Sequence, residues 1–116
     1  MEERTQGVVR AAGEGERHVM GASEVVIKAT AEDTGGAFVV TEVLLEGGFA
    51  GPPRHYHQRL HETLYLLEGE MVLTVGEDEA VLGPGGFASI PPGTVHTFRN
   101  DGERPVRALN VNAPAG

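Results

Sequence analysis

Residues 62–99 read ETLYLLEGEMVLTVGEDEAVLGPGGFASIPPGTVHTFR, a series of short apolar runs separated by turn residues. Runs of about four to eight residues rich in Val, Ile, Thr and Phe, bounded by Gly, Pro or Asp, are typical of β-strands. Glycine in the turns tolerates positive φ and proline presets φ, as at 68–69, 83–86 and 91–93. Short strands at such regular intervals predict an antiparallel β-barrel or β-sandwich.

The same pattern extends to both sides of this stretch. It predicts strands at 23–30, 36–46, 62–67, 70–75, 80–82, 87–90, 94–99 and 106–111. Residues 1–21 mix charges with Gly and Ala and show no periodicity, so we expect an N-terminal arm or a loosely attached first strand there. A chain of 116 residues needs only one domain, which we assign to residues 22–116.

The composition excludes several classes of protein. Cysteine is absent, so disulfides, thiolate metal sites and cysteine nucleophiles are excluded, and any metal must be bound by nitrogen and oxygen. Seventeen acidic and nine basic residues give a formal charge of -8, which would repel a nucleic acid. No apolar stretch approaches the roughly 18 residues that cross a bilayer, and the N-terminus does not resemble a signal peptide. We therefore expect a cytoplasmic protein without nucleic acid or membrane partners.

Four side chains form a candidate metal site: His55, His57, Glu62 and His96. Two residues apart on an extended chain, His55 and His57 project from the same face at a separation that one metal ion can bridge. Glu62 opens an apolar strand, and alternation places it on one face with Leu64 and Leu66. An unpaired carboxylate there would cost several kcal/mol or become protonated, so a cation is the expected partner.

Each of these residues also has an interpretation without a metal. The two histidines of His-x-His are often simply solvated, and Glu62 could form a surface ion pair with Arg54 or Arg59, worth about 0–1 kcal/mol. His96 alone could be a core histidine bonded to the backbone. The conjunction of all four favours the metal site. His61 should point to the opposite face from Glu62, and His18 lies in the N-terminal arm, so neither is assigned to it.

The spacing of these residues resembles the two sequence motifs of the cupins. The first motif, glycine, five residues, His-x-His, three or four residues, Glu, six residues, Gly, is similar to the run from His55 through Glu62 to Gly69. The second, glycine, five residues, Pro-x-Gly, two residues, His, three residues, Asn, is matched at every position from Gly85 through His96 to Asn100. One departure is Phe49, which stands where the first motif opens with glycine, so the resemblance leaves the turn before His55 open.

This resemblance implies an all-β fold, a jelly-roll barrel of six to eight antiparallel strands. It also implies one divalent transition-metal ion per chain, bound by the three histidines and Glu62, with Fe, Mn, Ni, Zn, Co or Cu all compatible with this donor set. Cupins commonly dimerise, so a homodimer is expected.

Four protein ligands leave one or two positions open, where water, O₂ or a chelating substrate can bind. Among cupins of this kind, the resemblance suggests a dioxygenase similar to the quercetin-cleaving type, acting on an aromatic or enediol-like small molecule. Glu62 would then be both ligand and catalytic base. Two alternatives stay open: a non-redox isomerase, cyclase or hydrolase, which needs a second titratable group such as His61 or Tyr65, and a non-enzymatic metal- or small-molecule-binding cupin.

Alternation also predicts candidates for an apolar pocket lining, which suits an aromatic or hydrophobic molecule better than a sugar phosphate. These candidates are Phe38 or Val40, Leu64, Leu66, Met71 or Val72, Leu73, Phe98 and Leu109. The competing interpretation is that they simply fill the core of a small barrel. Tyr56 should face away from the two histidines that flank it, and Arg54 and Arg59 are expected to be solvated.

Overall fold

The computed structural model describes residues 7–115, and within that range every regular element is a β-strand. The strands are β1 (Glu16–Met20), β2 (Ser23–Ala29), β3 (Val39–Leu45), β4 (His61–Glu68), β5 (Met71–Val75), β6 (Asp78–Leu82), β7 (Phe87–Ile90), β8 (His96–Arg99) and β9 (Val106–Ala113). All eight predicted strands are present, with some ends shifted by a few residues. The shifted ends lie beside turns, where a sequence pattern defines a strand boundary least well.

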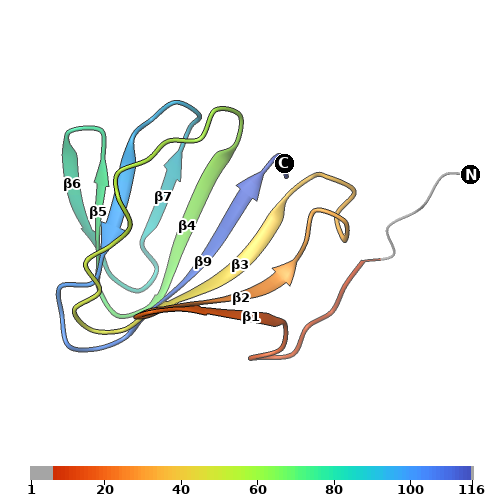
Figure 1. The fold of residues 1–116 in the computed structure, drawn as a ribbon, viewed down its shortest axis with the longest axis horizontal. Coiled ribbons are helices and arrows are strands. Elements are labelled where there is room, and N and C mark those ends of the chain that lie inside the picture. The colour runs from red at the N-terminus through yellow and green to blue at the C-terminus, as the bar shows by residue number, and fades with distance from the viewer. Residues whose placement is uncertain (1–6, 116) are drawn as a thin grey trace, which may run out of the picture.

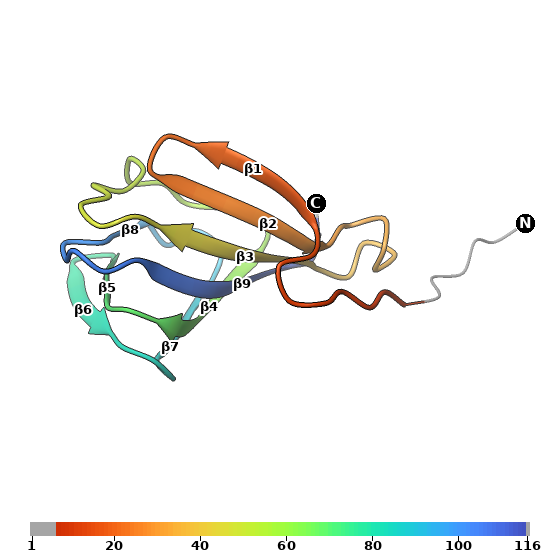
Figure 2. The ribbon, with the colours of Figure 1, turned by 90° about the horizontal axis from the view of Figure 1, so that it is seen from below.

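These strands form two antiparallel sheets. The larger sheet has the order β1-β2-β3-β9-β4-β7 and the smaller one β6-β5-β8. Figures 1 and 2 show the two sheets side by side, with the larger one fanning out toward the N-terminal strands. No helix in the described part of the chain is long and apolar enough to cross a membrane. The predicted all-β, antiparallel jelly-roll class is confirmed.

A ninth strand, β1, lies within the segment expected to be an arm or a first strand. It pairs with β2 from Glu16 opposite Ile27 to Met20 opposite Ser23, and all five of its residues are exposed. Residues 1–6 of the same segment lie outside the described residues. The resemblance implied six to eight strands, and β1 extends that number because the turn at Gly21, with φ +58°, returns the chain onto the sheet edge.

The core lies between the two sheets and follows the alternation of the sequence. Strand β4 buries Leu64 and Leu66 and leaves Tyr65 exposed, as expected for a strand with one face on the core. Both sheets contribute to one cluster, consisting of Leu45, Leu64, Leu66, Met71, Leu73, Ile90, Val106 and Ala108. Burying a leucine side chain of this kind contributes roughly 1.5–3 kcal/mol, so this cluster is the main stabilising contact between the sheets.

Asn100, the last residue of the second motif, is a buried side chain that hydrogen-bonds to backbone at the end of β3 and in the loop between β8 and β9. It is 1% exposed, and its Nδ2 donates to the carbonyls of Leu45, Glu46 and Arg104 at 3.2, 3.1 and 2.8 Å. Its Oδ1 accepts from the Gly102 amide at 3.1 Å. Asn100 therefore links the end of β3 to the loop before β9 through its side-chain amide.

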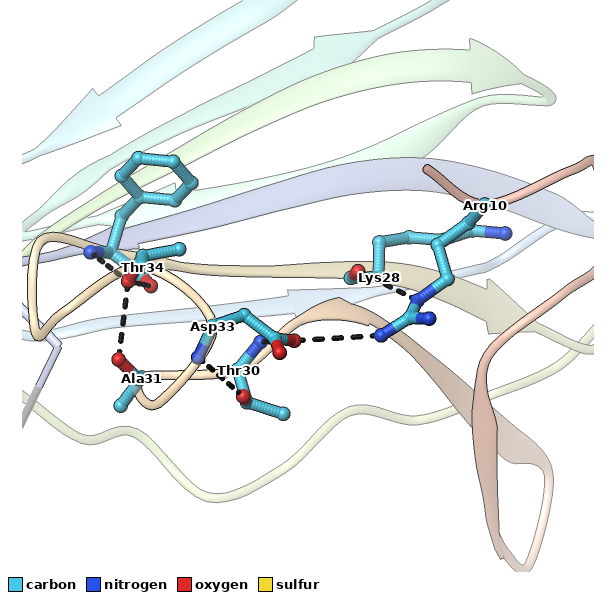
Figure 3. Close-up of polar contacts among 7 residues, drawn as sticks. Arg10, Lys28, Thr30, Ala31, Asp33 and Thr34 are labelled. Atoms are coloured by element: carbon cyan, nitrogen blue, oxygen red, sulfur yellow. Dashed lines mark hydrogen bonds and ion pairs between the residues drawn. The ribbon is translucent and has the colours of Figure 1, made fainter. Parts of the chain in front are cut away.

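The N-terminal segment is attached to the end of β2 and to the β2–β3 loop by polar contacts (Figure 3). Arg10 donates through Nε to the Lys28 carbonyl at 3.2 Å and pairs through Nη2 with Asp33 Oδ2 at 3.5 Å. The same Asp33 oxygen accepts from the Thr30 amide at 3.0 Å. The hydrogen bond from the Thr30 amide is the main cause of a lowered Asp33 pKa, with smaller contributions from the Thr30 hydroxyl and the Arg10 guanidinium and an opposing effect of desolvation.

Replacing Asn100 by Ala should lower the free energy of unfolding by about 3 kcal/mol, because four hydrogen bonds of a buried side chain are lost. Asn112→Ala is the matched control, since Asn112 Oδ1 has no hydrogen-bond partner, and should cost less. Urea unfolding measures both. A cost below about 1 kcal/mol for Asn100→Ala would contradict the structural role.

Replacing Asp33 by Asn retains an acceptor for the Thr30 amide and removes the charge that faces Arg10. Because folding lowers the pKa of Asp33, its ionised carboxylate stabilises the fold at pH values above the ordinary pKa of 3.8. This stabilisation is lost as the pH falls through the lowered pKa. Asp33→Asn should therefore be less stable than the unaltered protein at about pH 6, and the difference should vanish in strong acid. Urea unfolding at both pH values tests this, and a difference independent of pH would refute it.

Candidate metal centre

The structure brings His55, His57, Glu62 and His96 together at one end of the barrel. One ligand atom from each lies within 4.8 Å of the others. Glu62 is the second residue of β4 and His96 the first of β8, while His55 and His57 lie in the segment between β3 and β4. The sequence predicted this grouping, and binding of a metal by these residues stays a prediction.

Backbone hydrogen bonds between the two motifs determine where the histidines lie. His55 and His96 form an isolated antiparallel bridge, with the His55 amide donating to the His96 carbonyl at 3.1 Å and the reverse bond at 2.8 Å. The Gly93 amide, in the Pro-Pro-Gly turn, donates to the His57 carbonyl at 2.7 Å. Each histidine of the first motif is therefore held by a residue of the second.

Gly51 makes this close approach possible. Its φ is +93°, and a Cβ at this position would overlap the Phe98 carbonyl oxygen. Only glycine meets both conditions without strain. Phe49, the departure from the first motif, is instead half-buried and stacks on Phe98 with ring centroids 6.2 Å apart. The glycine needed before His55 thus lies two residues later than the motif places it.

Glu62 is buried among the histidines, with only 7% of the residue exposed. Its Oε1 lies 2.7 Å from His96 Nε2 and 3.4 Å from His57 Nε2. Arg54 donates to the Gly76 carbonyl at 3.4 Å, and neither Arg54 nor Arg59 forms an ion pair with Glu62 within the described residues. The alternative of a surface ion pair for Glu62 is therefore wrong.

Two of the histidines have a ring nitrogen facing a backbone carbonyl. Nδ1 of His96 lies 2.9 Å from the Thr94 carbonyl oxygen, and Nδ1 of His55 lies 3.0 Å from that of Pro53. A carbonyl only accepts, so Nδ1 carries the hydrogen in both rings and Nε2 is directed at the site. Nε2 of His96 then faces a carboxylate oxygen, and two acceptors at 2.7 Å require a proton or a cation between them.

This donor set fits a divalent transition metal. Bonds of about 2.1 Å place donor atoms on one ion up to about 4.2 Å apart, so small side-chain movements would bring the four atoms onto one ion. A hydrogen-bonded Nδ1 fixes the tautomer and ring orientation that a metal-ligating histidine needs. A carboxylate oxygen and three imidazoles form an oxygen and nitrogen set, which suits iron, manganese, nickel, zinc, cobalt or copper.

Asn110 is a site residue that was not predicted. It lies on β9, is 6% exposed, and its Nδ2 donates to Glu62 Oε2 at 2.6 Å. The sequence does contain a signal for it, because Val106, Ala108 and Asn110 share the buried face of β9. A polar amide on an apolar face needs a buried partner, and Glu62 is that partner.

A surface cavity of about 500 Å³ opens beside His57. It is lined by Tyr56, His57, Gln58, Arg59, Leu60, Pro114 and Ala115. The predicted apolar lining is not found there: Leu64, Leu66, Met71 and Leu73 are core residues, and Phe98 packs against them. Phe38, Val40 and Leu109 line a separate cavity of about 610 Å³ near the N-terminal segment. The competing core interpretation holds for most of the set, because a small barrel fills its interior with side chains.

The remaining candidates lie where alternation placed them. His61 is exposed at the start of β4, and Tyr65 is 44% exposed on the same face, opposite to Glu62. His18 is exposed on β1, with Nε2 3.4 Å from Glu16 Oε2. Tyr56 is exposed between the two histidines of the first motif. None of these four side chains belongs to the metal-ligand group.

Replacing His57 by Ala should reduce the affinity for Co(II) by more than the roughly 10- to 100-fold typical of residues that only support a ligand. His61→Ala is the matched control, because His61 lies four residues from His57 and is exposed on the face of β4 opposite to Glu62. Titration of metal-free, untagged protein by calorimetry measures both. Equal losses in the two variants would argue against a specific site at His57.

Comparisons with known proteins agree with this geometry. A quercetin 2,3-dioxygenase of Bacillus subtilis (strain 168) is 37% identical over 93 residues, which is 79% of this chain and 27% of that protein. The chain therefore spans about a quarter of its relative's length.

Two solved structures extend the comparison. TT1209 from Thermus thermophilus is 34% identical and superposes with a TM-score of 0.65. The match covers 70% of this chain and 76% of the TT1209 chain. A sugar phosphate isomerase from Silicibacter pomeroyi is 26% identical with a TM-score of 0.78, and the match covers 91% of this chain and 75% of the isomerase chain. The family model described as Cupin domain matches residues 41–112, which include both motifs and all four candidate ligands. The chain belongs to the cupin family.

Proposed function

We propose that this cupin is a metal-dependent dioxygenase, similar to the quercetin-cleaving type, that acts on an aromatic or enediol-like small molecule. The observation that carries the proposal is the buried Glu62 carboxylate, with Oε1 facing His96 and His57 in a group of potential ligands that also includes His55. The Bacillus subtilis relative named quercetin 2,3-dioxygenase supports it.

The ligand set leaves room for a substrate. Four protein donors occupy four positions, so one or two positions stay open on a five- or six-coordinate ion. When bound, Fe(II) or Mn(II) would supply both Lewis acidity and electron exchange with O₂. His57 is half-buried and lines the 500 Å³ cavity, so a small molecule bound in this cavity would lie beside one of the four candidate ligands.

Glu62 Oε1 is the group placed to accept a proton from a substrate hydroxyl. It is directed at His96 and His57, whereas Oε2 is held by Asn110, so Oε1 is the oxygen left for binding an ion or for accepting a proton. A general base must lie within hydrogen-bond reach of the proton that it removes, so the substrate hydroxyl would have to bind beside Oε1. His55 and His96, with Nδ1 bound to backbone carbonyls, keep their rings oriented during this transfer.

The Lewis-acid alternative would use the same site without O₂. The Silicibacter pomeroyi structure, named a sugar phosphate isomerase, shares the fold at 26% identity. Such a reaction needs a second titratable group facing the substrate, and the two candidates considered, His61 and Tyr65, lie on the opposite face of β4. We therefore favour the oxygenase. The homodimer and the cytoplasmic location stay predictions.

Iron- or manganese-loaded protein should consume O₂ when a flavonol or another enediol-like chelator is added, and an oxygen electrode measures the rate. Glu62→Gln should lower this rate by about 100-fold or more, because an amide cannot take the proton. His61→Ala is the control and should retain the rate. A loaded protein that neither consumes O₂ nor changes its metal spectrum with these compounds would exclude the dioxygenase, and isomerisation of a sugar phosphate without O₂ would support the alternative.

A further inference from the structure

Asn110 and Glu62 face each other inside the larger sheet. In the ladder between β4 and β9, Asn110 lies opposite Leu64 and Asn112 lies opposite Glu62. Residues directly opposite in an antiparallel pair share a face, so Asn110 reaches Glu62 along the diagonal. Its Nδ2 donates to Oε2 at 2.6 Å, and both residues are buried.

The two carboxylate oxygens of Glu62 therefore have different partners. Oε1 contacts the imidazoles of His96 and His57, and Oε2 accepts from Asn110. A glutamate carboxylate rotates readily about its last torsion, which has a broad preference. A hydrogen bond to one oxygen restricts this rotation. Without it, both oxygens could turn toward a bound ion, or the carboxylate could leave the site.

We propose that Asn110 is a positioning residue that makes Glu62 a one-oxygen ligand. The proposal rests on the metal site of the proposed function and adds the residue that determines how Glu62 binds. By holding Oε2, the amide keeps Oε1 directed at the histidines and leaves open the position that a second oxygen would fill. That position is one that a substrate needs.

The chemistry of asparagine suits this task. Its amide donates a hydrogen bond without bringing a charge, whereas Asp would place a second carboxylate about 3 Å from the first, and like charges at that distance oppose ionisation of both. Leu has a similar shape but no donor, so it would leave Oε2 buried and unpaired, the situation that buried polar atoms in folded proteins avoid.

The test compares Co(II) binding by the metal-free full chain and by the variants Asn110→Leu and Asn110→Ala. Both variants should bind Co(II) about 10- to 100-fold more weakly, the range typical of residues that orient a metal ligand. Their visible Co(II) absorption spectra should also differ from that of the unaltered protein, because a carboxylate that binds through two oxygens changes the coordination number. Circular dichroism establishes that each variant is folded, and the smaller Ala is used if Leu does not fold.

Asn112→Leu is the matched control, since Asn112 lies two residues along the same strand and its Oδ1 has no hydrogen-bond partner. It should retain both the affinity and the spectrum. Unchanged binding and spectra in the Asn110 variants, or equal losses in Asn112→Leu, would overturn the positioning role while leaving the metal site intact. Failure of the unaltered protein to bind Co(II) would overturn the proposed function and this inference together.

Discussion

Burial of the Glu62 carboxylate is the constraint on which the site depends. A carboxylate on the same buried face of β4 as Leu64 and Leu66 must be matched by donors or cations, because an unpaired buried charge costs several kcal/mol. The structure meets this requirement with His96 and His57 at one oxygen and Asn110 at the other. Glu62 on β4 therefore needs partners from two other strands, which are His96 on β8 and Asn110 on β9.

The two motifs are connected through the backbone rather than through their ligands alone. The His55–His96 bridge and the bond from Gly93 to the His57 carbonyl hold the histidine-bearing segment beside β8 through backbone contacts alone. Gly51 allows the segment before His55 to approach the backbone of β8 at Phe98. Asn100, directly after β8, is hydrogen-bonded to the Leu45 carbonyl at the end of β3. A site built this way is pre-organised, so less conformational entropy is lost when an ion or a substrate binds.

The site is not uniform in its burial. His96 and Glu62 are buried, whereas His55 and His57 are half-buried and His57 lines a surface cavity. The more exposed side of the site is therefore the side of His55 and His57. The hydrogen bond from Asn110 leaves Glu62 one oxygen for ligation or proton transfer, which connects the packing of β9 to the proposed reaction.

The sequence by itself determined eight of the nine strands, the buried face of β4 and the four candidate ligands, and it left β1 open as an arm or a first strand. Strand alternation and turn residues are local, and the spacing within each motif is short enough to specify which residues share a face. Asn110, the separation of Phe38, Val40 and Leu109 from the site, and the use of Gly51 in place of the motif's opening glycine came only from the tertiary structure. Each depends on which strands become neighbours: Asn110 reaches Glu62 because β9 pairs with β4, a contact across 48 positions that no local pattern encodes.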